Sequence, residues 1–175
     1  MTKKAAVIFS FVAGLVIGVT GTVALTVPYV HQITQYNATI ESQLFTEESA
    51  NGGVALERCD LTFGSGAKLY RVQQASTEQQ QGRGLSHRGS AGQGMYFPLP
   101  KPDKMVFWMR DTYFPLTVGF FDPDGVLFRL EDMEPNTDTF HFSEAVASGA
   151  LELPRGDFEG HRIRVGDKLT LVHCP

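Results

Sequence analysis

The segment VFWMRDTYFPLTVGFFDPDG, residues 106–125, places an arginine and an aspartate directly beside the largest apolar side chains of the sequence. Because side chains alternate between the two faces of a strand, Trp108 and Arg110 should share one face. An aromatic ring beside a guanidinium suits a sugar, a carboxylate or a peptide ligand. An arginine stacked on a tryptophan is also common on solvated sheet faces, where it is purely structural. Spacing alone favours the structural arrangement.

Two carboxyl groups could serve as an acid or a base. Asp111 directly follows Arg110, and Glu152 lies in an otherwise apolar Leu-Glu-Leu segment. An unpaired carboxylate away from water is too costly, so an inward-pointing Glu152 needs a cationic partner. We therefore predict that Glu152 pairs with Arg88 or Arg110.

The sequence shows no complete catalytic motif and no metal-binding motif. Gly-x-Ser-x-Gly is absent, and Ser86 beside His87 cannot form a triad by adjacency alone. His141 follows several acidic residues in the loop 131–141, but no tight ligand spacing such as His-x-x-x-His is present, so a solvated acidic loop is favoured over a cation site. We predict no catalytic residue, no metal and no cofactor from these patterns.

Residues 5–27 carry no charge and predict a transmembrane signal-anchor helix. At ~1.5 Å per residue the helix would span about 34 Å, enough to cross a hydrocarbon core of ~30 Å. Lys3 and Lys4 should keep residues 1–4 in the cytoplasm and place the rest of the chain outside it. A cleaved signal peptide is the alternative, and it gives the same compartment. Gly14 and Gly18 form a GxxxG pair, which offers a weak route to a homodimer.

Residues 28–53 predict a stalk or linker, because apolar residues recur there at helical spacing until Asn51-Gly52-Gly53. From Val54 apolar and polar residues alternate, so we predict that residues 54–175 form an extracytoplasmic β domain. This domain contains two cysteines. In an oxidising compartment Cys59 and Cys174 should form a disulfide.

The net charge is −4, and no basic tract exceeds Lys3-Lys4, so nucleic acid is excluded as a partner.

Short alternating segments separated by turns predict a mainly β fold, either a jelly-roll-like sandwich or a partly closed barrel with one short helix. Met105, Phe107 and Met109 should face the core. A capping box at Ser76–Gln79 should open the helix, which should end near Gly82–Gly84. The predicted strands lie near 61–63, 69–72, 105–110, 116–121, 126–131, 151–153 and 169–173, with a β-turn at 122–125. The segment RGSAGQGMYF, residues 88–97, predicts a glycine-rich turn that leads into a further strand.

The ordered motifs GLSHR, GMYFPL, FWMRDTYFPLTVGFFDPDGVL and ALELPRG before IRVGDKL resemble domain-of-unknown-function family 192 over about residues 68–172. The resemblance implies a small jelly-roll-like β fold, usually exported or membrane-tethered, without an established activity. This chain has Arg110-Asp111 where Lys-Asn is usual, and the Asp111 charge could pair with Arg88 or Arg110. The family pattern highlights Gly84, Leu85, Arg88, Gly94, Met95, Phe107, Trp108, Met109, Thr112, Pro115, Leu116, Gly125, Glu152 and Gly156.

Two function hypotheses follow. The first is a membrane-anchored binding or assembly module that presents a cleft to an envelope polysaccharide or protein. The alternative is a hydrolase or lyase that acts on an envelope polymer with Asp111 or Glu152 as acid or base. Two titratable groups that converge in one pocket would favour the enzyme, and the sequence, which shows no paired motif, favours the module. The candidate ligand-binding residues are Arg88, Trp108, Arg110, Asp111, Thr112 and Glu152.

Overall fold

The computed structural model describes residues 56–175. The predicted membrane helix at 5–27, the Gly14–Gly18 pair and the stalk at 28–53 therefore lie outside the described residues. Within residues 56–175, none of the helices has the length and apolar character that a bilayer crossing requires.

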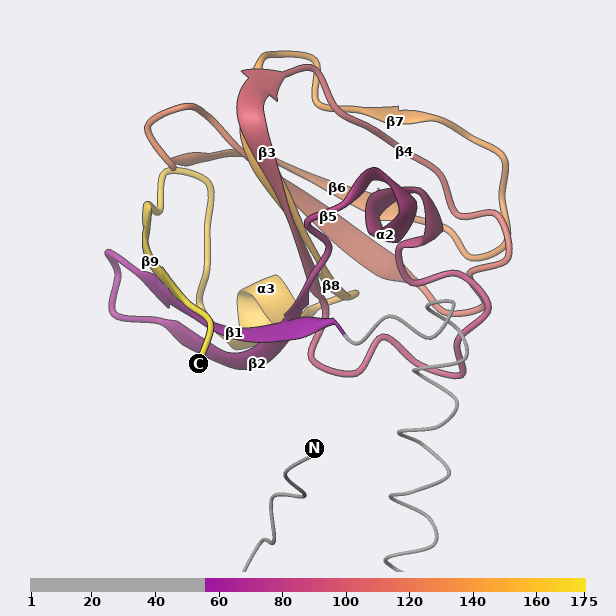
Figure 1. Cartoon of the computed structure of the whole chain (residues 1–175), viewed down its shortest axis with the longest axis horizontal. Helices are drawn as coiled ribbons and strands as arrows, with labels where there is room; N and C mark the ends of the chain where they lie inside the picture. The colour runs from indigo at the N-terminus through magenta and orange to yellow at the C-terminus, as the bar shows by residue number, and fades with distance from the viewer. Residues whose placement is uncertain (1–55) are drawn as a thin grey trace, which may run out of the picture. The chain divides into compact units, whose positions relative to one another are not determined.

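Seven strands form one sheet in the order β6-β5-β8-β3-β2-β1-β9, and β4 and β7 form a separate pair. Neighbouring strands are antiparallel except β2 and β3, which run parallel. The sheet curls into a half-barrel (Figure 1), so the predicted mainly β fold is confirmed and the curl corresponds to the partly closed barrel. The strands are β1 (Glu57–Phe63), β2 (Lys68–Gln74), β3 (Met95–Asp103), β4 (Val106–Phe107), β5 (Leu116–Phe121), β6 (Leu127–Met133), β7 (His141–Phe142), β8 (Ala147–Pro154) and β9 (Leu169–His173).

Apolar clusters cover both faces of the central strands. All six residues of β5 are buried, with Val118 and Phe120 in one cluster and Phe121 in the other. On β8, Ala150 belongs to the first cluster, whereas Leu151 belongs to the second. The alternation of a strand therefore turns the next residue, Glu152, toward the face of the first cluster. An acidic side chain thus enters an otherwise apolar layer.

The helix α2 (Glu78–Arg83) begins one residue later than the predicted capping box. Thr77, not Ser76, is the N-cap, and its hydroxyl accepts from the backbone N–H of Gln80, whose side chain accepts from the Thr77 N–H. The amide of Gln81 donates to the carbonyls of Ala75 and Pro98, at 3.1 and 3.0 Å, and so fixes the helix beside β3.

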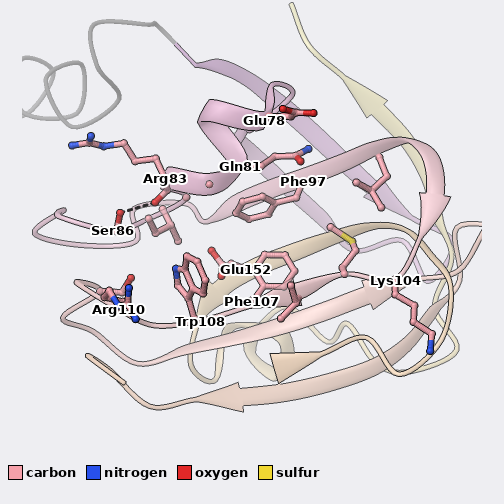
Figure 2. Close-up of a pocket in the computed structure, with 17 residues that line it drawn as sticks. Glu78, Gln81, Arg83, Ser86, Phe97, Lys104, Phe107, Trp108, Arg110 and Glu152 are labelled. Atoms are coloured by element: carbon pink, nitrogen blue, oxygen red, sulfur yellow. Dashed lines mark hydrogen bonds between the residues drawn. The ribbon is translucent and has the colours of Figure 1, made fainter. Parts of the chain in front are cut away.

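The segment predicted as a strand at 105–110 is mostly irregular, since only Val106 and Phe107 form β4. The predicted alternation is nevertheless present: Met105 and Met109 are buried, whereas Val106, Trp108 and Arg110 are exposed. Phe107 packs edge-on against Phe97 of β3, with ring centroids 5.1 Å apart (Figure 2). β4 thereby covers the face of the sheet that carries Glu152.

Within residues 56–175 the structure also contains the helix α3 (Asp157–Gly160), which was not predicted because it comprises a single turn. Its buried Phe158 packs over Gly119 of β5. A Cβ atom at Gly119 would lie 2.8 Å from Phe158 Cζ and 2.9 Å from Leu127 Cδ1, closer than real Cβ contacts allow. The glycine therefore lets α3 cover the second apolar cluster.

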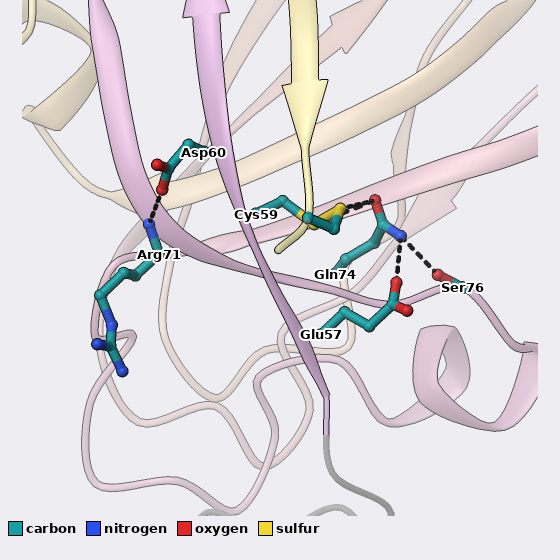
Figure 3. The surroundings of a disulfide bond; sticks show 7 residues. Glu57, Cys59, Asp60, Arg71, Gln74 and Ser76 are labelled. Atoms are coloured by element: carbon teal, nitrogen blue, oxygen red, sulfur yellow. Dashed lines mark hydrogen bonds between the residues drawn. A yellow bond between two sulfur atoms is a disulfide. The ribbon is translucent and has the colours of Figure 1, made fainter. Parts of the chain in front are cut away.

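The predicted disulfide joins Cys59 of β1 to Cys174, which follows β9 (Figure 3). The side-chain oxygen of Gln74 lies 3.6 Å from Cys59 Sγ and 3.7 Å from Cys174 Sγ. Its amide nitrogen donates to Glu57 and Ser76, at 3.1 and 2.9 Å, which fixes the orientation of the amide. The bridge ties β9, the edge strand of the sheet, to its neighbour β1.

We expect removal of the disulfide to destabilise the domain strongly. The bridge spans a sequence separation of 115, and a chain-entropy argument assigns a loop of this size up to about 5 kcal/mol. Urea unfolding should therefore show the free energy of unfolding of Cys59→Ala/Cys174→Ala lowered by up to that amount. Alkylation of the native chain without reductant should add no label, and the addition of two labels would contradict the bridge.

We expect Gly119→Ala to lower the free energy of unfolding by about 1–3 kcal/mol, because the added methyl group overpacks the contact with Phe158. Gly160→Ala is the matched control, since no heavy atom lies within 4 Å of its added Cβ. Urea unfolding of both variants measures the difference. Equal stability of the two variants would show that α3 does not need the close approach.

Candidate ligand-binding pocket

A pocket of about 400 Å³ opens between α2 and the segment around β4 (Figure 2). Its volume lies within the range of about 300–1,000 Å³ that is typical of ligand sites. The wall on the α2 side continues into the loop that follows Gly84, where the helix ends in a positive φ of 51°. The lining residues are Glu78, Gln81, Gly82, Arg83, Gly84, Leu85, Ser86, Phe97, Leu99, Lys104, Met105, Val106, Phe107, Trp108, Arg110, Thr112 and Glu152.

Aromatic rings form much of this lining. Phe97 and Phe107 both line the pocket and meet edge-on, and Trp108 stands beside them with 47% of its surface exposed. The guanidinium carbon of Arg110 lies 5.5 Å from the centroid of the Trp108 ring. The stacked pair predicted from the sequence is thus present, and it stands at the pocket rather than on an unrelated solvated face.

Arg110 is held by a second contact, a 2.7 Å ion pair between its Nε and Asp138 Oδ1. The hydrogen bond and the charge of Asp138 raise the pKa of Arg110 above its usual range. Both side chains are well exposed, so the pair contributes little to stability. Its effect is to position the guanidinium over Trp108.

Among the pocket-lining residues, Glu152 has a buried carboxyl group, with only 4% of the residue surface exposed. Burial raises the pKa of its carboxyl to about 8, and the charge of Arg88 opposes the shift without cancelling it. The carboxyl is therefore mostly protonated at neutral pH. In this state it can donate one hydrogen bond and still accept others.

Arg88 lies behind the pocket rather than in its lining. Its side chain is buried and donates from Nη1 to Gln73 Oε1 at 2.5 Å. Of the two predicted partners of Glu152, Arg88 is the one whose charge acts on its pKa. Arg110, the other predicted partner, is instead bound to Asp138 at the rim.

The close approach of two backbones places Glu152. It pairs with Met95 of β3 and Val118 of β5, and Gly94 crosses directly over it. A Cβ atom at Gly94 would lie 2.3 Å from the Glu152 carbonyl oxygen, and Gly94 has a φ of +84°. Only glycine satisfies both conditions without strain.

Asp111 does not line the pocket. Its carboxylate lies 3.6 Å from His87 Nε2, and its carbonyl accepts from the His87 N–H at 2.7 Å. The sequence analysis predicted that Asp111 could pair with Arg88 or Arg110. Of the contributions that change the pKa of Arg110, the charge of Asp111 is the smallest. Asp111 has a φ of 56°, a conformation that asparagine and aspartate both tolerate, so the departure from the family's asparagine preserves the turn.

Thr112 is buried and lines the pocket from the turn that follows Trp108. Its N–H donates to Met109 at 3.1 Å, and its carbonyl accepts from Asn136 at 2.8 Å. Trp108, Arg110, Thr112 and Glu152 are therefore the predicted candidates that converge. Sequence reasoning missed four lining residues: Gln81, Arg83, Phe97 and Lys104. Gln81 and Arg83 belong to the predicted helix and Phe97 follows the predicted glycine-rich turn, whereas no sequence signal indicated Lys104.

Glu131 and Asp132, predicted as part of a solvated acidic loop, lie in β6, and they and Glu134 of the following loop pair with basic side chains of the domain. Glu131 contacts both Arg129 and His141, at 2.5 and 2.7 Å, and Arg155 lies 3.7 Å from Asp132 and 3.0 Å from Glu134. Across residues 56–175, His, Cys, Asp and Glu side chains form no group of three or more suited to a metal ion.

Residues 61–171, more than half of the chain, match the family model of DUF192, described as "Uncharacterized ACR, COG1430". The chain belongs to the DUF192 family. A solved structure of a proposed transcription regulator from Sinorhizobium meliloti 1021 is 30% identical, with a TM-score of 0.58, over 66% of this chain and 93% of that one. A protein of unknown function from Novosphingobium aromaticivorans DSM 12444 is 28% identical, with a TM-score of 0.59, over 68% and 87%. No curated protein matches.

The buried carboxyl should make the stability of this DUF192 domain depend on pH. The folded state keeps the Glu152 proton up to about pH 8, whereas the unfolded chain releases it near 4.5. The free energy of unfolding should therefore fall as pH rises through this window, by up to about 1.4 kcal/mol per pH unit. Urea unfolding of Glu152→Gln should give a flatter profile, and the exposed Glu159→Gln should keep the original slope. A slope that Glu152→Gln leaves unchanged would contradict the assignment.

Proposed function

We propose that this DUF192 domain is a binding module that takes a sugar unit of an envelope glycan into the pocket between α2 and β4. One observation carries the proposal: Trp108, Arg110, Thr112 and Glu152 converge on one pocket. An open aromatic ring beside a few convergent polar groups is the usual composition of a small-ligand site.

The chemistry of the lining suits a sugar. A pyranose presents an apolar face, which can stack on the half-exposed ring of Trp108, and a rim of hydroxyls that both donate and accept. The protonated carboxyl of Glu152 and the hydroxyl of Thr112 also donate and accept, so they can pair with hydroxyls without an uncompensated charge. The concave pocket favours a sugar over the flat interface of a protein partner.

The proposed setting is the outer side of a membrane, with residues 5–27 as the anchor and 28–53 as the stalk. The Cys59–Cys174 disulfide supports this setting, because such bonds persist in oxidising compartments. The charge of the chain argues against nucleic acid, so the regulator role proposed for the S. meliloti relative does not carry over.

A hydrolase or lyase is the second candidate, and the raised pKa of Glu152 favours it as a general acid. Glycoside hydrolysis normally requires a second carboxyl group about 5–10 Å away across the sugar. Asp111 is outside the lining, and the other lining carboxyl, Glu78, belongs to the exposed face of α2. One buried carboxyl with apolar neighbours supports binding better than catalysis.

Calorimetric titration of the full chain in detergent micelles with neutral and acidic saccharides tests the proposal. We expect saturable binding that Trp108→Ala weakens at least about tenfold, equivalent to about 1.4 kcal/mol, because the stacking surface is lost. Tyr113→Ala is the matched control, since Tyr113 is 60% exposed and lies outside the lining. Equal losses in the two variants, or no binding of any saccharide, would contradict the proposal.

A further inference from the structure

Three aromatic side chains form an exposed row that begins at the pocket. Trp108, Phe140 and Phe142 are 47%, 52% and 50% exposed. The ring centroids of Trp108 and Phe140 are 5.8 Å apart, and those of Phe140 and Phe142 are 6.2 Å apart. Three neighbouring rings, each about half exposed, form a contiguous apolar patch of the kind that marks an interaction site.

The backbone holds this aromatic row in place. Val106 of β4 pairs with Phe142 of β7, and Met105 and Ser143 exchange hydrogen bonds of 3.0 Å beside them. Between the two exposed phenylalanines, His141 is buried and its Nδ1 contacts Glu131 at 2.7 Å. Phe142 therefore stands on a hydrogen-bonded strand pair, and Trp108 and Phe140 directly adjoin its two strands, which reduces the entropy lost when a ligand stacks on the rings.

Trp108 belongs to both the pocket lining and the aromatic row, so the two form one continuous surface. A ligand longer than one sugar that enters the pocket would continue over Phe140 and Phe142. The geometry thus fits a chain rather than an isolated small molecule.

Cations stand at opposite ends of the pocket. Figure 2 shows Arg83 and Lys104 on either side of the aromatic centre. Neither makes an ion pair within the described part of the chain, and the buried Nε of Arg83 has no hydrogen-bond partner there. Glu152 is mostly neutral at pH 7, which leaves Glu78 as the opposing lining carboxylate. Separated positive charges suit a ligand that carries several negative charges along its length.

We propose that the ligand is an acidic polysaccharide, with one sugar in the pocket, further sugars stacked along the aromatic row, and carboxylates near Arg83 and Lys104. This inference rests on the proposed sugar-binding function and names its ligand class. A bilayer surface fits less well, because the exposed Arg110–Asp138 pair beside Trp108 would lose its water there. Sugar hydroxyls can instead hydrogen-bond to that pair.

The test uses Trp108 itself, which is the only tryptophan of the sequence, so tryptophan fluorescence excited selectively over the tyrosines reports on this surface alone. The full chain in detergent micelles is titrated with oligogalacturonates of increasing length and with neutral gluco-oligosaccharides of the same lengths. We expect affinity for the acidic series to rise at least about tenfold with length and to exceed that for the neutral series by a similar factor. Added salt should weaken the acidic series selectively.

Variants separate the aromatic row from the pocket. Phe140→Ala and Phe142→Ala should weaken the long acidic oligosaccharides and leave galacturonic acid monomer unaffected. Tyr70→Ala, a similarly exposed aromatic on β2, should change neither. Lys104→Gln should reduce the preference for acidic over neutral chains, whereas the exposed Lys168→Gln should not.

The outcomes distinguish this inference from the proposed function. Equal binding of neutral and acidic chains, or a row variant that leaves the long chains unaffected, would overturn the acidic-polymer class while sugar binding stands. If no saccharide alters Trp108 fluorescence, both proposals fail. The full chain is also transferred from neutral to anionic phospholipid nanodiscs. If Trp108 fluorescence shifts to the blue only on this transfer, the aromatic row binds the membrane surface and the inference is overturned.

Discussion

The burial of one carboxyl group on β8 governs the arrangement of this domain. Glu152 lies between β3 and β5 in a layer that is otherwise apolar, and removal from water raises its pKa to about 8. The free energy of burying an isolated ionised carboxylate there would be prohibitively high. The charge of the neighbouring Arg88 and the protonation that follows from the raised pKa both reduce this desolvation penalty. Gly94 allows the β3 backbone to pass within contact of the same residue. Local strand geometry and electrostatics are therefore coupled at one position.

The sheet does not cover this carboxyl by itself, and its covering elements create the pocket. α2 is fixed to β3 through the Gln81 amide, while β4 approaches from the opposite side through the Phe97–Phe107 contact. The two elements meet incompletely, and the remaining space is bordered by Trp108. A buried polar group at the base of an incompletely covered apolar layer is the combination from which ligand sites are commonly built.

The disulfide, the helix α3 and the β4–β7 strand pair stabilise the fold at places outside the Glu152 site. The disulfide ties β9 to β1 at the edge of the sheet, and Phe158 of α3 closes the second apolar cluster over Gly119. On the side of the pocket, Phe142 of β7 faces outward because its neighbours His141 and Ser143 are buried, and Trp108 and Phe140 directly adjoin the β4–β7 pair. The disulfide-linked domain thus carries a contiguous patch of exposed aromatic rings, the kind of surface that marks an interaction site.

The sequence by itself determined what depends on neighbours along the chain. Alternation located most strands and placed Met105 and Met109 inward and Trp108 and Arg110 outward, turn chemistry located the turn at 122–125, and two cysteines implied one bridge. Single-turn α3 and two-residue β7 are too short to leave a periodic signal. The pocket, the Asp111–His87 contact and the pKa of Glu152 were decided by tertiary structure alone. Each depends on segments distant in sequence that meet only when the sheet curls, and on burial, which no single segment specifies.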